Sequence, residues 1–191
     1  MKARESGMPA EDYWQTFFDT DATLDRLIPG TRINGDLVEF GCGYGTFTLP
    51  AARRTDGRLT ALDIEPAMVA CVREKAVAHG VTNLEAVLRD FVTEGTGLAT
   101  ASQAHAMVFN LLHLEDPVGL LREAHRVLMP GGLVSVIHWR SDVPTPRGPS
   151  LEIRPLPSQC AGWLETAGFR GIRPVELSGA CPYHFGLLAE R

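Results

Sequence analysis

The chain has 191 residues, of which 45% are hydrophobic and 21% are charged. These proportions are ordinary for a globular domain and exclude a disordered or low-complexity chain. The net charge of −5 argues against a surface that holds nucleic acid through clustered cations, and against a polybasic membrane anchor.

Targeting and cysteine signals are those of a cytoplasmic protein. The N-terminal stretch lacks the apolar segment of a secretory signal. No run approaches the roughly 18 apolar residues that a membrane span needs. The chain has four cysteines, and none of them form a CxxC pair: Cys42, Cys71, Cys160 and Cys181. No two histidines have the spacing of a zinc finger. We expect reduced thiols, no membrane span and no metal site.

The first predicted element is a helix over residues 9–28, followed by a Pro-Gly pair that ends it. Its interrupted apolar face includes Trp14, Phe17 and Phe18. An aromatic stripe at helical spacing is typical of core packing, and it also suits a lid over a binding site. Both interpretations are open from the sequence.

The rest of the chain alternates between strands and helices. Strands are predicted at 36–40, 58–64, 84–88, 104–110, 133–138, 170–177 and 183–189. Helices are predicted at 46–54, from Pro66 to Gly80, at 117–128 and at 158–167. Between them, the Pro-Gly-Gly of 130–132 is expected to end a helix, and residues 142–157 are expected to be irregular.

This alternation predicts an α/β fold, a Rossmann-like, doubly wound sheet of seven mostly parallel strands with helices on both faces. The last two strands, joined by a short turn, predict a hairpin with one antiparallel strand at the sheet edge. We expect one domain over 1–191, with a helical lid at 1–30 and the Rossmann-like core at 36–189.

The segment from Glu39 to Gly45 reads E-F-G-C-G-Y-G and joins a predicted strand to a helix. Glycine lets a ligand approach bare backbone, and a helix N-terminus favours negative charge. Thr46 stands where the dinucleotide fingerprint has its last glycine, so the spacing argues against an NAD-type site. Thr46 is also expected to cap the following helix.

Two acidic residues follow the next two predicted strands. Asp63 ends the second strand, where a carboxylate can accept hydrogen bonds from both hydroxyls of a ribose. Asp90 ends the third strand, where a carboxylate can accept from an exocyclic amine, and Phe91 beside it can cover a purine. Together with the glycine turn, these positions indicate an adenosyl ligand.

This constellation resembles the class I S-adenosylmethionine-dependent methyltransferases, in particular the small-molecule group that includes the ubiquinone/menaquinone methyltransferases. The resemblance covers most of the chain. Five segments follow the family's order: 39–45, 59–76, 88–91, 104–139 and 161–177. The absence of an N/D-P-P-Y/F segment after the fourth strand argues against methylation of DNA bases.

The resemblance implies S-adenosylmethionine as cofactor and S-adenosylhomocysteine as product. It places the glycines near the methionine part, with Glu39 organising the ammonium group. Met68 is placed at the adenine, although its helical spacing also suits core packing. The implied cofactor-binding residues are Glu39, Phe40, Gly41, Cys42, Gly43, Gly45, Asp63, Ile64, Met68, Asp90, Phe91, Asn110 and Leu111.

His113 and His138 follow the fourth and fifth strands, where the family's substrate pocket opens. Histidine can act as a general base near neutral pH, so both are candidate catalytic residues, with loop or ring packing as the alternative. Leu111, Leu112, Leu114 and Trp139 lie on the same segments and favour an apolar pocket.

The function expected from these features is in-line transfer of a methyl group to a small-molecule acceptor. Nucleic acid is not expected as a partner, and the protein is expected to be a monomer or a homodimer. Two alternatives are open: a cofactor-binding sensor or scaffold without catalysis, and another transferase on the same fold, such as an aminopropyltransferase. An aminopropyltransferase requires an acidic residue in the region of Asn110, which this chain lacks.

Overall fold

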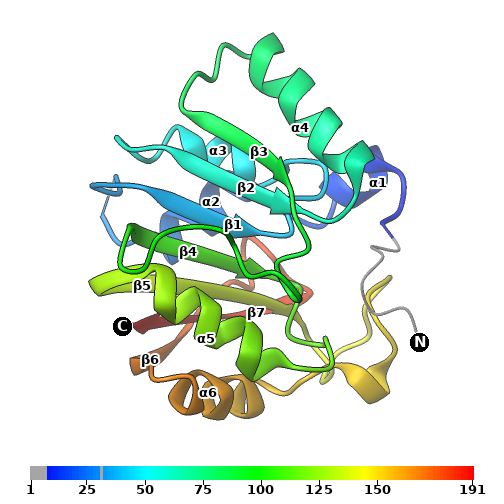
Figure 1. Ribbon diagram of the computed structural model, residues 1–191. Coiled ribbons are helices and arrows are strands. Elements are labelled where there is room, and N and C mark those ends of the chain that lie inside the picture. The colour runs from blue at the N-terminus through cyan, green and yellow to red at the C-terminus, as the bar shows by residue number, and fades with distance from the viewer. Residues whose placement is uncertain (1–7, 31) are drawn as a thin grey trace.

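One mixed sheet forms the centre of the protein, and its strand order is β3-β2-β1-β4-β5-β7-β6 (Figure 1). The structure is a computed structural model that describes residues 8–30 and 32–191. The strands are β1 (Leu37–Phe40), β2 (Leu59–Asp63), β3 (Leu84–Leu88), β4 (Gln103–Phe109), β5 (Leu128–Trp139), β6 (Arg170–Val175) and β7 (His184–Glu190). The helices are α1 (Glu11–Gln15), α2 (Thr20–Leu27), α3 (Thr48–Ala52), α4 (Pro66–Ala78), α5 (Pro117–Val127), α6 (Pro157–Thr166) and the 3-10 helix η1 (Leu151–Ile153).

The five strands β3, β2, β1, β4 and β5 pair in parallel, and β7 pairs antiparallel with both β5 and β6. The mostly parallel, doubly wound sheet predicted from the sequence is therefore confirmed. The predicted position of the antiparallel strand at the edge is wrong, because β7 lies inside the sheet and β6 forms the edge. Most of β7 is buried, whereas β6 is largely exposed and carries Arg170, Arg173 and Pro174. Charged residues and proline are tolerated at a sheet edge.

Helices cover both faces of the sheet, and two apolar clusters form the core. In Figure 1, α5 and α6 lie in front of the sheet. Leu121 of α5 and Leu164 of α6 pack on the face that carries Val38. Leu24 of α2 and Val72 of α4 belong to the cluster on the opposite face, which includes Leu37. Successive residues of a strand point to opposite faces, so β1 contributes to both clusters.

The structure differs from the sequence prediction at three helix ends. The helix predicted over 9–28 is broken into α1 and α2, because the Asp19 carboxylate accepts from the Ala22 amide and caps a new helix. Helix α3 begins at Thr48, with Phe47 and not Thr46 at its N-cap. The Pro-Gly-Gly segment lies within β5 and does not separate it from α5.

Of the predicted lid at 1–30, residues 1–7 lie outside the described residues. No helix in the described part of the chain is long and apolar enough to cross a membrane.

Candidate active site

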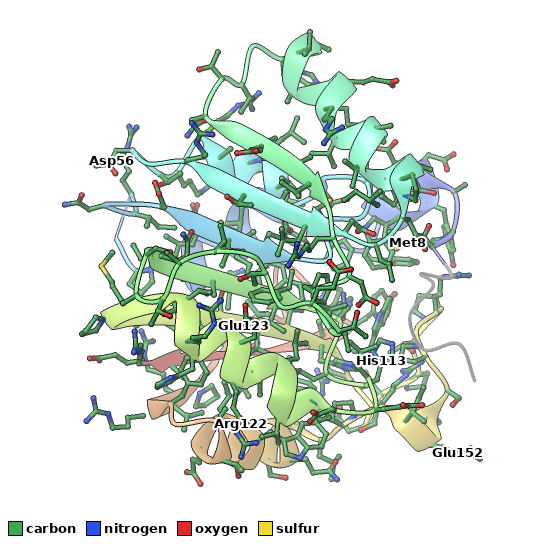
Figure 2. All side chains as sticks on the ribbon, in the orientation of Figure 1. Met8, Asp56, His113, Arg122, Glu123 and Glu152 are labelled. Atoms are coloured by element: carbon green, nitrogen blue, oxygen red, sulfur yellow. The ribbon has the colours of Figure 1, made fainter. Side chains whose placement is uncertain are left out.

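A cavity of about 500 Å³ opens at the carboxyl ends of β1 to β5. The end residues or following loops of these strands contribute to its wall: Glu39, Asp63, Asp90, Phe109 and Trp139. Figure 2 shows Met8, His113 and Glu152 at this end of the sheet. The chain order reverses between β1 and β4, and ligands of doubly wound sheets bind outside the strand ends at such a switch point.

The turn after β1 presents bare backbone to the cavity. Gly41, Gly43 and Gly45 have φ angles of +72°, +50° and +80°, a region that favours glycine. Gly41 and Gly43 border the cavity, but Gly45 does not. A Cβ on Gly45 would lie 2.7 Å from Leu49 Cδ1 and 3.1 Å from Val72 Cγ2. Gly45 therefore serves the packing of α3 and α4, while the first two glycines shape the cavity.

Asp63 connects the end of β2 to the glycine turn. Its carboxylate accepts hydrogen bonds from the Gly43 amide at 2.8 Å and from the Glu65 amide at 3.0 Å. Burial raises the pKa of Asp63, and these two backbone amides oppose that rise. The carboxylate thus lies at the cavity wall and holds the turn in place.

The part of the cavity beyond β2 and β3 is lined by Ile64, Asp90 and Phe91. The Asp90 carboxylate accepts from the amides of Val92 and Thr93, both at 3.2 Å, which fixes the loop that carries Phe91. Phe40 does not line the cavity; its ring supports Phe91 edge-on at 5.4 Å. These contacts give the cavity a flat apolar wall beside two carboxylates.

Cys42 lines the cavity but is not a reactive thiol. Its side chain is buried, and burial together with Glu39 and Asp63 raises the pKa of the thiol. A protonated thiol is a poor nucleophile. Cys42 is therefore a small residue that fits a tight turn.

Glu39 is a buried acid whose side chain reaches the cavity from β1. It is 2% exposed, and the Thr48 hydroxyl donates a hydrogen bond to its Oε2 atom. Burial raises the pKa of Glu39 from 4.5 to about 8, with a smaller increase from nearby Asp63. Glu39 is consequently protonated at neutral pH in the protein without ligand.

Because folded Glu39 is protonated, we expect it to make the unfolding free energy depend on pH. The Glu39→Gln variant should lack this contribution. The pKa is higher in the folded than in the unfolded state, so the Glu39 contribution is complete below pH 4.5 and is lost as the pH rises to about 8. Relative to Glu39→Gln, the wild type should lose on the order of 4 kcal/mol of unfolding free energy across this range. Urea unfolding of both proteins at several pH values measures the difference. The buried histidines are present in both proteins, so their effect on the unfolding free energy cancels in the comparison. Parallel plots of unfolding free energy against pH for the two proteins would show that Glu39 is ionised in the folded state.

The far half of the cavity, beyond β4 and β5, is largely aromatic and aliphatic. Trp14, Phe47, Phe109 and Trp139 contribute to its wall. Asn110 lies between this half and the glycine turn, with a φ of +59° that is unusual for a residue other than glycine. Its Oδ1 atom is buried and has no hydrogen-bond partner among the described residues. Asparagine adopts this conformation more readily than most residues, and its buried polar atom without a partner is available to a ligand.

The two candidate histidines occupy different positions. His113 lines the cavity, whereas His138 is fully buried and does not line it. The His113 Nδ1 and His138 Nε2 atoms are 3.2 Å apart. Burial lowers the pKa of His113 and lowers that of His138 to about 3. Of the pair, His113 alone borders the cavity, and both rings are neutral at neutral pH.

A sequence profile described as "Methyltransferase domain" matches residues 37–132, which is half of the chain. The chain belongs to the methyltransferase-domain family. The matched segment begins with β1 and the glycine turn and ends within β5, so it contains most of the strand ends that line the cavity.

Individual relatives of this methyltransferase-domain protein agree with that assignment. It is 27% identical to aklanonic acid methyltransferase DauC of Streptomyces sp. strain C5, over 63% of this chain and 62% of that protein. It is 32% identical to the ubiquinone biosynthesis O-methyltransferase of Ruegeria pomeroyi, over 61% of this chain and 44% of that protein. The chain thus matches less than two thirds of either relative. A methyltransferase structure from Aquifex aeolicus shares the fold, with a TM-score of 0.78 and 24% identity, covering 91% of this chain and 90% of that one.

The cavity brings together most of the residues that the sequence indicated. Those that line it are Glu39, Gly41, Cys42, Gly43, Asp63, Ile64, Asp90, Phe91, Asn110, Leu111 and His113. The remaining candidates, Phe40, Gly45, Met68 and His138, do not line it. Leu112, expected in the apolar pocket, lies instead in the core with no exposed surface. Leu114 and Trp139, expected there too, do line the cavity.

Sequence reasoning missed several lining residues. They are Met8, Pro9, Thr46, Phe47, Val92, Phe109, Arg147, Gly148, Pro149 and Ile153. Phe109 directly precedes Asn110 at a strand end, so its position was a usable signal. Residues 147–149 and Ile153 come from the segment expected to be irregular, where no periodicity indicates which side chains point inward.

The N-terminal segment covers the glycine turn and is fastened to it by polar contacts. The Tyr44 hydroxyl donates to the Pro9 carbonyl at 2.9 Å, and Lys75 donates to the Tyr44 carbonyl at 2.7 Å and also to Glu11. A Cβ on Gly43 would lie 3.3 Å from Met8 Cε. Residues 8–15 thus lie over the part of the turn that faces the cavity.

Tyr44→Phe should loosen this N-terminal cover without changing the turn itself. The change removes one partly buried hydrogen bond, worth about 0.5–1.5 kcal/mol. Local opening should therefore increase roughly twofold to tenfold, because that free energy applies to the covering segment alone. Limited proteolysis within residues 8–18 measures it. Tyr13→Phe, on a ring that is 45% exposed, is the control; equal cleavage of both variants would disprove the role of the Tyr44 hydroxyl.

Proposed function

We propose that this protein transfers the methyl group of S-adenosylmethionine to a small, largely apolar acceptor that gives up a proton. The observation that carries the proposal is a single cavity with two different ends. One end has glycine backbone and the carboxyl groups of Glu39, Asp63 and Asp90. The other has aromatic and aliphatic walls and the imidazole of His113.

The first end fits an adenosyl cofactor with an amino-acid tail. Asp63 offers carboxylate oxygens to a ribose, and the flat apolar wall of Ile64 and Phe91 suits a purine. The unpaired Oδ1 atom of Asn110 can accept a hydrogen bond from the ammonium group, and Glu39 lies on the same side of the cavity. Gly41 and Gly43 leave room for the methionine part because they carry no side chain.

The second end suits an apolar acceptor of limited size. Trp14, Phe47, Phe109 and Trp139 supply aromatic contact area, and the whole cavity is about 500 Å³, within the usual range for small-molecule sites. The names of two relatives, an aklanonic acid methyltransferase and a ubiquinone biosynthesis O-methyltransferase, support an acceptor of this class. A nucleic acid would meet a net charge of −5.

The chain's part in the reaction is mainly positioning. When bound, S-adenosylmethionine supplies an electrophilic methyl group carried on a sulfonium. Holding an acceptor in line with that group can contribute about 7–11 kcal/mol to the lowering of the barrier. Neutral His113 accepts the proton that the acceptor loses as it takes the methyl group. A general base of this kind suits a hydroxyl acceptor.

The experiment that tests this function has two stages. Calorimetry on the full chain should show binding of S-adenosylmethionine and S-adenosylhomocysteine and little binding of NAD. A metabolite extract, incubated with protein and methyl-labelled S-adenosylmethionine, should then yield label in small molecules. Label found mainly in RNA, DNA or protein would overturn the proposed acceptor class. Binding without transfer to any acceptor would favour a sensor or scaffold, and transfer of an aminopropyl group would favour the other transferase.

We further propose that the described residues belong to one domain, that the protein acts in the cytoplasm, and that it works as a monomer or homodimer without a nucleic-acid partner. The single sheet with helices on both faces supports the domain assignment. Among residues 8–30 and 32–191, no group of three metal-ligating side chains is placed to hold a metal ion. Light scattering of the purified chain measures its oligomeric state.

A further inference from the structure

The fold places two histidines against each other behind the acceptor end of the cavity. His113 lies in the loop after β4, and His138 is the next-to-last residue of β5. The strands β4 and β5 are parallel neighbours, with Phe109 paired to Ile137 in register, so the loop after β4 lies beside the end of β5. The ring centroids are 5.4 Å apart and the planes make an angle of 69°. The Nδ1 atom of His113 and the Nε2 atom of His138 are 3.2 Å apart, within hydrogen-bond distance.

A chain of hydrogen bonds assigns the proton on each ring. The other nitrogen of His138, Nδ1, lies 3.3 Å from the carbonyl oxygen of Trp139. A carbonyl oxygen only accepts, so His138 Nδ1 carries the hydrogen. In a neutral ring Nε2 then carries a lone pair, and His113 must donate through Nδ1. Neutral His113 is left with its lone pair on Nε2, the nitrogen on the side of the ring away from His138.

The surroundings keep His138 neutral and therefore able to accept. The charged or titratable groups that act on it are His113 from the loop after β4, His184 from β7 and Arg154 from the segment after η1. Burial opposes a positive charge on His138 most, and His113 and Arg154 oppose it further. The carbonyl of Trp139 acts in the other direction, with a smaller effect.

We propose that His138 is a positioning residue that holds His113 in the tautomer with the hydrogen on Nδ1, so that His113 Nε2 takes the acceptor's proton. The proposal rests on the proposed function for its catalytic consequence, and His138 itself does not line the cavity. Once His113 is protonated, its Nδ1–H group still donates to His138, now as a charge-assisted hydrogen bond. His138 thus orients the base before the proton transfer and stabilises its cationic form afterwards.

The first test reads the tautomer without any turnover. Long-range proton–nitrogen NMR spectra of the full chain with labelled histidine distinguish the two tautomers, and His113→Gln assigns the His113 signals. We expect the Nδ1–H tautomer for His113 in the wild type and in His138→Gln, whose amide oxygen can accept. In His138→Leu, we expect His113 to lose this fixed tautomer. A wild-type His113 with its hydrogen on Nε2 would overturn the proposal, even if the leucine variant failed to fold.

The second test concerns turnover with a methyl acceptor found by the labelling experiment. His138→Leu should lower kcat roughly tenfold or more, since a misoriented base contributes little to proton transfer. The KM for S-adenosylmethionine should stay nearly constant, and His138→Gln should recover most of the loss. A shifted tautomer with unchanged kcat would overturn the catalytic part of the proposal. Because the NMR result needs no acceptor, failure of the proposed function leaves the tautomer assignment separately tested.

Discussion

Gly43→Val is expected to weaken the binding of S-adenosylmethionine by more than about a hundredfold, or about 2.7 kcal/mol. Gly43 borders the cavity with a φ of +50°, and its amide donates to Asp63 at 2.8 Å. A β-branched residue is strained in that conformation, so the turn must shift and its hydrogen bond to Asp63 must weaken. The isopropyl group would also occupy space where the ligand meets bare backbone. Calorimetric titration of wild type and variant measures the loss.

Gly80→Val is the matched control for this experiment. Gly80 follows α4 with a φ of +64°, and a Cβ there would meet no atom within 4 Å. It therefore carries similar backbone strain without touching the cavity. Both variants should lose unfolding free energy, and Gly80→Val should bind S-adenosylmethionine as the wild type does. Equal loss of affinity in both variants would attribute the effect to general destabilisation and remove Gly43 from the site.

The core of the fold and the grouping of Asp63 and Asp90 with the glycine turn were predictable because their signals are local. The strands β1, β2 and β3 are short and each is followed by a turn or loop, and in a parallel sheet all such ends meet at one edge. Asp63 and Asp90 could thus be placed near the glycine turn without knowledge of the strand order. The position of Gly45 shows the limit: its spacing matches the turn, but the side that it faces depends on how α3 and α4 pack.

The aromatic half of the cavity was less predictable because long-range contacts shape it. Arg154 donates to the carbonyl oxygens of Pro149 at 2.7 Å, Arg140 at 2.8 Å and Arg147 at 3.1 Å. These hydrogen bonds fold the irregular segment so that Pro149 lines the cavity. No local sequence pattern indicates which backbone carbonyl oxygens will accept hydrogen bonds from one arginine. The different roles of His113 and His138 likewise follow from pairing between strands far apart in the sequence.

His113→Gln is expected to lower kcat for methyl transfer by about a hundredfold to ten-thousandfold, the usual contribution of a general base. His113 lines the cavity, and its neutral ring presents Nε2 as the basic nitrogen. Glutamine keeps a polar side chain of similar size but cannot take up a proton. The KM for S-adenosylmethionine should change little, because the adenosyl end is formed by other residues. Steady-state kinetics with an acceptor found by the labelling experiment measure both constants.

The pH profile separates loss of a base from loss of packing. Burial lowers the pKa of His113 below its ordinary value of 6.5, so wild-type kcat should rise with pH through a pKa below that value and then level off. The rise should disappear in His113→Gln, while His79→Gln, at an exposed position after α4, should keep the wild-type profile. An acceptor that is already nucleophilic needs no base, and His113→Gln would then keep full kcat. That result would leave the cavity as a site that catalyses by positioning alone, and it would exclude a hydroxyl acceptor that depends on His113.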